Sequence, residues 1–412
     1  MLNIVTKKTS FENNKEVFSQ IFNMEKLLFF FLLILFIHSC KSRNDNDYGT
    51  IVNEERCSYK NNYELIGPEI KEFVLDDETV NLISYMQYID SLECLSFLNN
   101  YNTSIYFYNN RSSKFLHRIK MDSANSIIGK IDGYYWNNNS IYVYSYNLGI
   151  IYWIDSDYSV KAKYSMSNAS KGSESMIYPA PYLQTLAPLK KYHNKLLSVG
   201  FVTGEPSLET SHNRTVVTIL DLYDKSIQNV VNYPELYTRY NWAGGFTYRM
   251  PSYDLVDESI IINFPASHYL VKYSLVTGEQ SNYYAGSSSI EVIKSFPFPK
   301  DFAINEVKAW EWYMNNPSYE SILYDRYRKL YYRIARLPLK NYVKKEKGNR
   351  KPIVIIILDA HLQYIGEVNL PTDVQFFPTN CYVSKDGFHI QVLTDDENIL
   401  TFYQYNFKKN EK

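Results

Sequence analysis

The chain has 412 residues and an almost balanced charge, with 43 Lys and Arg residues against 44 Asp and Glu residues. This length exceeds the roughly 250–300 residues of one simple hydrophobic core, so we expect either two domains or an architecture that repeats. The charge balance argues against a nucleic-acid binder held by electrostatics, and a hydrophobic content of 45% excludes a disordered chain. The 40 tyrosines and only 15 glycines favour β-strands.

The first forty residues have the pattern of a targeting segment. Residues 27–37, LLFFFLLILFI, form an apolar run that is too short for a bilayer span of about 20 residues but has the length of a signal-peptide core. Lys26 precedes this run, and Ser39 and Cys40 follow it. We therefore predict a signal peptide over 24–39 that starts at Met24, which makes residues 1–23 a mis-called upstream extension.

The order of a basic residue, an apolar run, a small residue and a cysteine resembles a bacterial lipoprotein signal, with IHSC (37–40) as its lipobox. The resemblance implies that the thiolate of Cys40 takes a diacylglycerol and that cleavage frees its amine for a further acyl chain, because stable anchoring needs two chains or more. The alternative is an ordinary signal peptide with a chance cysteine. Residues 40–69 are then the lipidated cysteine and a flexible tether. Lys41 leaves the outer membrane open as the destination, on either its periplasmic or its surface side.

Short strand-like runs recur from about residue 70 to residue 407, in six sets of up to four. The second run of each set marks the repeat: ECLSFLN (93–99), SIYVYSY (140–146), KLLSVGF (195–201), SIIINF (259–264), KLYYRIA (329–335) and FHIQVLT (388–394). The last set lacks a fourth strand, and KEFVLDD (71–77) at the other end of the chain can supply it. The pattern predicts an all-β, six-bladed β-propeller over 70–412, closed by an N-terminal strand. A β-sandwich or two barrels is the alternative.

The whole of 70–412 resembles the six-bladed, TolB-like β-propeller lipoproteins of Bacteroidota, many of them of unknown function. The segments that carry the resemblance are YESILYDRYRKLYYR (319–333) and the order FVLDD, LSFLN, SIYFYN near the start. These motifs imply a fold rather than a chemistry.

The loops of the expected propeller are unequal. The turns between first and second and between third and fourth strands are short, whereas the loops on the opposite face are long, at 167–182, 202–214, 235–245, 286–318 and 336–351. Because function concentrates in loops held by a rigid scaffold, we expect the long-loop face to be the working face. The longest loop predicts an inserted helix near 301–315, which packs through Ala303, Val307, Trp310 and Met314.

Aromatic and basic residues of these loops are the candidate ligand contacts. They are Arg239, Trp242 and Arg249, together with Trp312, which lies off the helix stripe, and Tyr178. Such groups suit sugars or other flat or anionic ligands, through stacking and bidentate hydrogen bonds. The alternative is that they only cover the mouth of the channel.

The sequence contains no HExxH, GxSxG or P-loop motif, so we predict no catalytic residue, metal or cofactor. Cys57, Cys94 and Cys381 remain beside Cys40 without a CxxC spacing, which favours buried free thiols. Two tripeptides, at Ser91 and Ser123, resemble the O-glycosylation acceptors of Bacteroidota.

We expect a lipid-anchored protein of the outer membrane that binds or scaffolds a glycan, peptide or protein partner on its long-loop face. Its other partner is the membrane, through the anchor, and no nucleic acid is expected. The alternative is a secreted carbohydrate-active enzyme, a glycosidase or lyase, on the same fold.

Overall fold

The computed structural model describes residues 49–55, 63–121, 128–137, 140–156, 158–166, 179–201, 214–243, 246–298, 305–339, 342 and 350–410. The predicted upstream extension, signal peptide and Cys40 lie outside these ranges.

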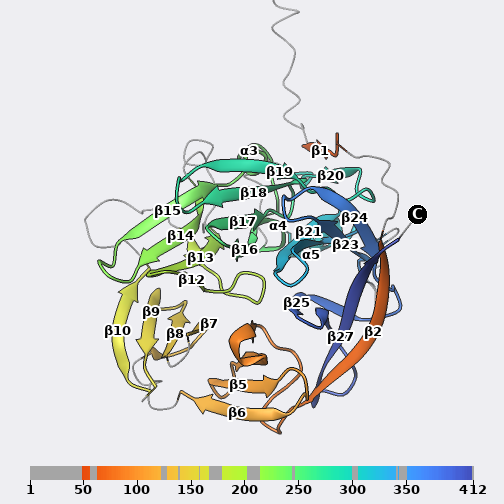
Figure 1. Ribbon diagram of the computed structural model, residues 1–412. Helices are drawn as coiled ribbons and strands as arrows, with labels where there is room; N and C mark the ends of the chain where they lie inside the picture. The colour runs from red at the N-terminus through yellow and green to blue at the C-terminus, as the bar shows by residue number, and fades with distance from the viewer. Residues whose placement is uncertain are drawn as a thin grey trace, which may run out of the picture. The chain divides into compact units, whose positions relative to one another are not determined.

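Six antiparallel sheets follow one another around a central axis, as Figure 1 shows. The first blade contains β3 (Met86–Ile89), β4 (Cys94–Asn99), β5 (Ser104–Asn109) and β6 (Phe115–Lys120). The second contains β7 (Gly133–Asn137), β8 (Ser140–Ser145), β9 (Ile150–Ile154) and β10 (Val160–Ser165). The third contains β11 (Ala180–Pro181), β12 (Lys190–Tyr192), β13 (Lys195–Phe201), β14 (Thr215–Asp221) and β15 (Ile227–Asn232). In the third blade, β11 and β12 both pair with β13.

The next two blades are β16 (Ser252–Val256), β17 (Ser259–Asn263), β18 (Tyr269–Ser274) and β19 (Gln280–Tyr284), and β21 (Ser318–Asp325), β22 (Leu330–Arg336), β23 (Ile353–Leu358) and β24 (Tyr364–Asn369). The sixth blade contains β25 (Phe376–Ser384), β26 (Gly387–Val392), β27 (Ile399–Lys409) and β2 (Tyr63–Val74). The predicted six-bladed β-propeller is therefore confirmed, and the sandwich and barrel alternatives are excluded.

The middle strands of the blades are buried on both faces, because each sheet packs against a neighbour on either side. All six residues of β4 and of β23 are buried, and the second of these strands is the apolar run IVIIIL. Outer strands such as β6 and β19 have mostly exposed or half-buried residues. The core thus lies between blades, which explains why the repeats have apolar residues at successive positions rather than at alternate ones.

The ring closes through β2, which pairs with β27 and places Phe73 opposite Leu400. Figure 1 shows the two strands side by side although they lie at opposite ends of the described chain. Closure by an N-terminal strand is confirmed. The strand begins at Tyr63, however, so it takes in part of the segment that the sequence analysis assigns to the tether.

A second part of the expected tether is also a strand. β1 (Thr50–Val52) pairs with β20 (Val292–Lys294), which belongs to the connection between the fourth and fifth blades. The buried side chain of Asn53 donates hydrogen bonds to the carbonyls of Ser287 and Ile290 at 3.0 and 2.8 Å. Residues 49–55 are therefore bound to the propeller rather than free, because backbone and side-chain bonds both attach them.

Two arginines of the segment 319–333 join blades. The fully buried Arg333 donates from Nε to Oδ1 of Asn263 at 2.8 Å and from its terminal nitrogens to the carbonyls of Ser267 and Ala285, all in the fourth blade. Arg328 pairs with Asp325 at 2.9 Å and also donates to Asn406 and to the carbonyl of Lys385 in the sixth blade.

In the described part of the chain, three short α-helices lie in the connections between blades: α3 (Glu235–Arg239), α4 (Phe246–Arg249) and α5 (Glu306–Met314). A 3₁₀-helix, η1 (Asp90–Leu92), links β3 to β4. The α5 helix confirms the predicted inserted helix, and its N-cap is Asn305, whose side chain accepts from the amides of Val307 and Lys308. No helix in the described ranges is long and apolar enough to span a membrane.

The predicted packing stripe of α5 is wrong for two of its residues. Val307 and Trp310 are 44% and 51% exposed, whereas Tyr313 and Met314 are buried. Spacing alone does not select the buried face of a helix of nine residues. Here it is set by the aromatic residues of the preceding crossover, against which Trp312 packs.

Candidate functional site

The two faces of the ring differ as predicted. The turns between first and second and between third and fourth strands contain at most five residues, such as Asp257 and Glu258 between β16 and β17. The loops on the other face include the connections from β15 to β16 and from β19 to β21, which carry α3, α4 and α5. We call these the short-turn face and the long-loop face.

The channel between the six innermost strands is blocked by a segment of the third blade, residues 184–188. Thr185 accepts a hydrogen bond from the amide of Met86 in the first blade and donates one to Asn380 in the sixth. The carbonyl of Leu186 accepts from the amide of Tyr253 in the fourth blade. The segment therefore has bonds to three other blades, and it separates a cavity on the long-loop side from one on the short-turn side.

The long-loop cavity has a volume of ≈ 420 Å³ and takes residues from four blades. Its lining includes Ser84, Lys130, Asp132, Tyr146, Tyr182 and Thr379. These residues come from the crossovers before β3 and before β7, from the β8–β9 turn, from the segment between β11 and β12, and from the first half of β25.

Polar and aromatic groups are held in place around the long-loop cavity. Asp132 accepts from the amide of Tyr146 at 2.7 Å and lies 3.5 Å from the ammonium group of Lys130. The rings of Tyr146 and Tyr182 meet edge to face, with centroids 6.2 Å apart. The hydroxyl oxygen of Thr379 is buried and has no hydrogen-bond partner in the described part of the chain. Aromatic rings beside fixed hydrogen-bonding groups are the usual components of a small-molecule site.

The short-turn cavity is larger, at ≈ 520 Å³, and takes residues from all six blades. Its lining includes Tyr88, Trp136, Lys191, Asp254, Tyr324 and Tyr382, one from each blade in chain order. No sequence pattern marks this cavity, because loop length indicates a site only where loops are long and the short-turn face has only short loops.

Two of the predicted ligand contacts are parts of the core. Trp242 is 2% exposed and its indole nitrogen donates to the carbonyl of Leu236 at 3.0 Å. Its ring stacks on Tyr248, and Trp312 packs against Tyr248 with ring centroids 4.7 Å apart. The two tryptophans therefore attach α5 to the preceding crossover, and neither lines the two axial cavities.

The predicted arginine contacts are also away from both cavities. Arg239 is exposed at the end of α3, over the ring of Tyr240. Arg249 is half-buried at the end of α4, and its carbonyl accepts from the hydroxyl of Tyr233. Tyr178 lies outside the described residues. The predicted set is thus not brought together in one site.

The two possible O-glycosylation sites have different positions. Ser91 is exposed within η1 and lines the short-turn cavity, while the preceding Asp90 accepts from Arg326 at 3.2 Å and from the hydroxyl of Tyr327. Ser123 lies outside the described residues. Modification of either serine stays a prediction.

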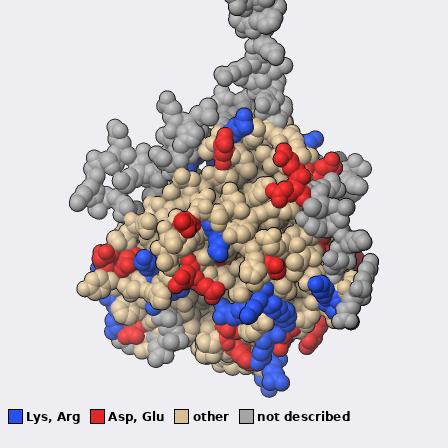
Figure 2. Space-filling view, turned by 45° about the horizontal axis from the view of Figure 1, so that its top comes forward, with Lys and Arg blue, Asp and Glu red and all other residues tan. Residues whose placement is uncertain are grey.

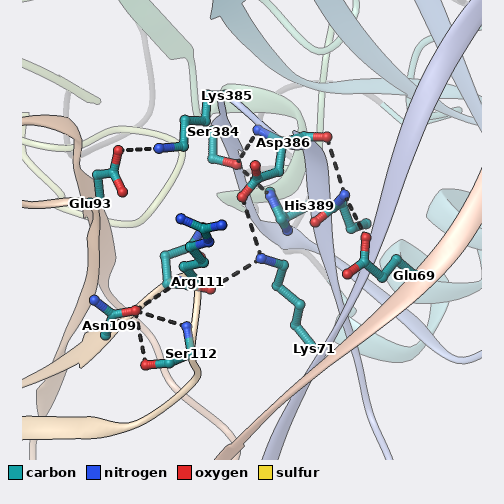
Figure 3. Close-up of polar contacts among 12 residues, drawn as sticks. Glu69, Lys71, Glu93, Asn109, Arg111, Ser112, Ser384, Lys385, Asp386 and His389 are labelled. Carbon is teal, nitrogen blue, oxygen red and sulfur yellow. Dashed lines mark hydrogen bonds and ion pairs between the residues drawn. The ribbon is translucent and has the colours of Figure 1, made fainter.

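One pair of side chains has the composition of a nucleophile and its base. Ser384 and Nε2 of His389 are 2.8 Å apart, as Figure 3 shows. Both residues are fully buried, and burial together with the nearby Lys71 cation holds the pKa of His389 well below its usual value. Because no substrate reaches a buried hydroxyl, this pair supports the junction of the ring rather than a hydrolysis.

The junction between the sixth and first blades is polar on the short-turn side. The buried Lys71 of β2 donates to the carbonyl of Asn110 at 3.1 Å and lies 3.6 Å from a carboxylate oxygen of Asp386 (Figure 3). Lys385 pairs with Glu93 beside it. These contacts tie the closing strand to both blades.

Two cysteines are described, and the prediction of buried free thiols is confirmed for both. Cys94 and Cys381 are buried and unpaired, and burial raises the pKa of the Cys94 thiol to about 11. Cys57 and Cys40 lie outside the described residues. No group of three or more His, Cys, Asp or Glu side chains suited to a metal occurs in the described part of the chain.

Charge alone does not single out a binding surface. Figure 2 shows basic and acidic side chains beside one another on the viewed side, separated by wide uncharged areas. The two axial cavities, which have defined walls, are therefore better candidates than the charged groups on this side.

Residues 62–369 match the family model described as "Domain of unknown function (DUF4221)". The match covers well over half of the chain, which therefore belongs to this family.

Solved structures that resemble the propeller include the following two. A member of the DUF4221 family from Bacteroides vulgatus is 20% identical, with a TM-score of 0.70, and the match covers 85% of this chain and 100% of that one. A protein from Bacteroides fragilis described as a candidate exported protein is 12% identical, with a TM-score of 0.50 and coverage of 83% and 96%. At these identities the likeness shows the fold alone. No curated protein matches the chain.

Proposed function

We propose that this protein is a lipid-anchored binding protein of the bacterial outer membrane, of the TolB-like propeller group, which holds a glycan, peptide or protein partner in the long-loop cavity. The observation that carries the binding role is the cavity itself. Its walls come from four blades and combine the rings of Tyr146 and Tyr182 with the charged groups of Lys130 and Asp132.

Anchoring is supported by the sequence at Cys40 and by the Bacteroides fragilis relative that is described as a candidate for export. Metabolic labelling with an alkyne fatty acid tests it. Wild type is expected to be labelled and Cys40→Ala is not, while Cys57→Ala serves as the matched cysteine control and keeps its label. Equal labelling of wild type and Cys40→Ala refutes the anchor.

A glycan and peptide array probed with the purified full chain tests binding. A ligand of the long-loop cavity is expected to lose affinity at least tenfold in Tyr146→Ala, because the ring forms one wall. Tyr223→Ala is the control, since Tyr223 is 89% exposed in the β14–β15 turn on the other face. Ligands that bind equally to wild type and Tyr146→Ala place the function elsewhere.

A further inference from the structure

The short-turn cavity contains five charged side chains, four of which are already paired. The Oδ1 of Asp254 accepts from the ammonium group of Lys190 and from the amide of Leu255, and its Oδ2 accepts from the amide of Tyr324. Both oxygens of this carboxylate are therefore occupied by groups of the protein.

The second carboxylate of the cavity is occupied in the same way. One oxygen of Asp90 accepts from the hydroxyl of Tyr327, and the other accepts from Arg326 at 3.2 Å. Each oxygen of Asp254 and Asp90 already accepts a hydrogen bond, and each carboxylate is paired with a cation of the protein, which makes a cationic guest unfavourable here.

Lys191 is the charge that remains. It is half-buried, and its ammonium group lies over the ring of Tyr142, 5.8 Å from the centroid. Within the described ranges it has no carboxylate partner. After the two ion pairs are counted, the cavity therefore keeps one positive charge in a partly desolvated position, where attraction to an anion is stronger than in water.

Residues of the same lining also carry neutral polar groups that have no hydrogen-bond partner in the described part of the chain. They are the hydroxyls of Tyr135 and Tyr324 and the indole nitrogen of Trp136, none of which makes a hydrogen bond to another described residue. Burial raises the pKa of both tyrosines, so each hydroxyl keeps its proton and can donate. Hydrogen-bonding groups carried on aromatic rings suit a ligand that has hydroxyl groups and apolar ring faces.

We propose that the short-turn cavity is a second binding site, which takes an acidic sugar unit whose carboxylate pairs with Lys191. The aromatic walls contact the sugar ring, and the tyrosine hydroxyls and the indole N–H bond its hydroxyl groups. This site is separate from the proposed long-loop site, because the segment 184–188 lies between the two cavities.

Calorimetric titration of the purified full chain with trigalacturonate tests the proposal, and fully methyl-esterified trigalacturonate is the neutral probe of the same ring structure. Wild type is expected to bind the acid at least tenfold more tightly than the ester, with affinity that falls as salt is added. Lys191→Gln is expected to lose this preference and to bind both probes equally.

Lys225→Gln is the matched control, because Lys225 also lies 5.8 Å from a tyrosine ring, that of Tyr164, but outside the cavity. Its preference for the acid is expected to equal that of wild type, and circular dichroism checks that both variants fold. Failure of wild type to bind trigalacturonate, or an unchanged preference in Lys191→Gln, overturns the proposal. Loss of acid binding in Tyr146→Ala rather than in Lys191→Gln assigns the sugar to the long-loop cavity and also overturns it.

Discussion

The hydroxyl of Thr185 donates a hydrogen bond of 2.7 Å to Oδ1 of Asn380, a residue 195 positions further along the chain. The side-chain Nδ2 of Asn380 donates in turn to the carbonyl of Ile83 and to Oε1 of Gln391, both at 2.7 Å. These bonds connect the third, sixth and first blades at the axis. They fix the segment 184–188, which separates the two cavities, and so the shape of both proposed sites depends on them.

Replacement of Thr185 by valine keeps the shape of the side chain but removes the hydroxyl. The amide of Met86 and Oδ1 of Asn380 then lose a partner, which we expect to cost about 1–3 kcal/mol of the free energy of unfolding. Urea denaturation measures the change. The control is Thr394→Val, since Thr394 is exposed and its hydroxyl donates only to the nearby carbonyl of Asp396, and we expect no change beyond about 0.5 kcal/mol. Equal effects of the two variants contradict a role for the Thr185 bridge.

Arg333 is expected to be among the most sensitive positions of the ring. Its guanidinium group is fully buried 3.6 Å from the centroid of the Tyr319 ring and donates to several groups of the fourth blade. Arg333→Met leaves these buried acceptors without a donor, and because each unsatisfied buried acceptor costs about 1–3 kcal/mol, we expect a total loss of about 3–5 kcal/mol. Arg326→Met removes the same side chain from a solvent-exposed pair with Asp90 and is expected to cost at most about 1 kcal/mol.

Denaturation of the two arginine variants in parallel gives the comparison. Arg333→Lys is included because it keeps the charge but supplies fewer donors, and an intermediate loss is expected. If Arg333→Met and Arg326→Met have the same midpoint, the buried contacts of Arg333 do not stabilise the junction between the fourth and fifth blades.

The blades could be predicted from sequence because each blade buries both faces of its middle strands, which leaves a dense apolar run such as IVIIIL in every repeat. The pairing of β2 with β27 followed from the missing fourth strand of the last repeat. The cavities could not be predicted in this way. Lys191 and Tyr324, for example, are brought to one cavity by the curvature of the ring, and no local pattern marks either residue.

Trp242 and Trp312 are the converse case, because the sequence singles them out as ligand contacts but the fold places them in an aromatic cluster. Trp242 lies in a crossover rich in aromatic residues, a composition that suits a ligand platform and a buried cluster equally well. The outcome depends on Tyr248 and on α5, which cover the ring of Trp242 in the folded protein. Long-range packing of this kind leaves no signal in the spacing of residues along the chain.

Closure of the ring is expected to depend on Phe73. This side chain is fully buried and meets the rings of Tyr108 and Phe402 edge to face, at centroid distances of 5.8 and 6.0 Å. Phe73→Ala is expected to cost about 3–5 kcal/mol, because it removes a large side chain from a packed junction. Its neighbour Val74 is 68% exposed, and Val74→Ala is the matched control, with an expected change within about 0.5 kcal/mol.

Removal of the strand itself tests closure more severely. A chain that starts at residue 78 exposes the edge of β27, and we expect it to aggregate or to unfold because an unpaired apolar edge associates with other chains. Thermal unfolding and gel filtration are measured for Phe73→Ala, for Val74→Ala and for the truncated chain. A truncated chain that stays monomeric and keeps the wild-type melting temperature contradicts closure through β2.

The last prediction concerns the loss of stability at acid pH. His268 is buried between Tyr319, whose hydroxyl lies 2.7 Å from Nδ1, and the carbonyl of Ile51 in β1. Burial, together with the nearby Arg333 cation, lowers the pKa of His268 to about 4. In the unfolded chain the pKa is about 6.5, so the unfolded state binds the proton more tightly and stability is lost as the pH falls from about 6.5 toward 4. This single group accounts for about 3 kcal/mol of that loss.

Urea denaturation across this pH range is expected to show a shallower decline of the free energy of unfolding in His268→Gln than in wild type. The control His361→Gln, at an exposed turn, is expected to keep the wild-type slope. Identical slopes in wild type and His268→Gln would show that this histidine does not couple the attachment of β1 to pH.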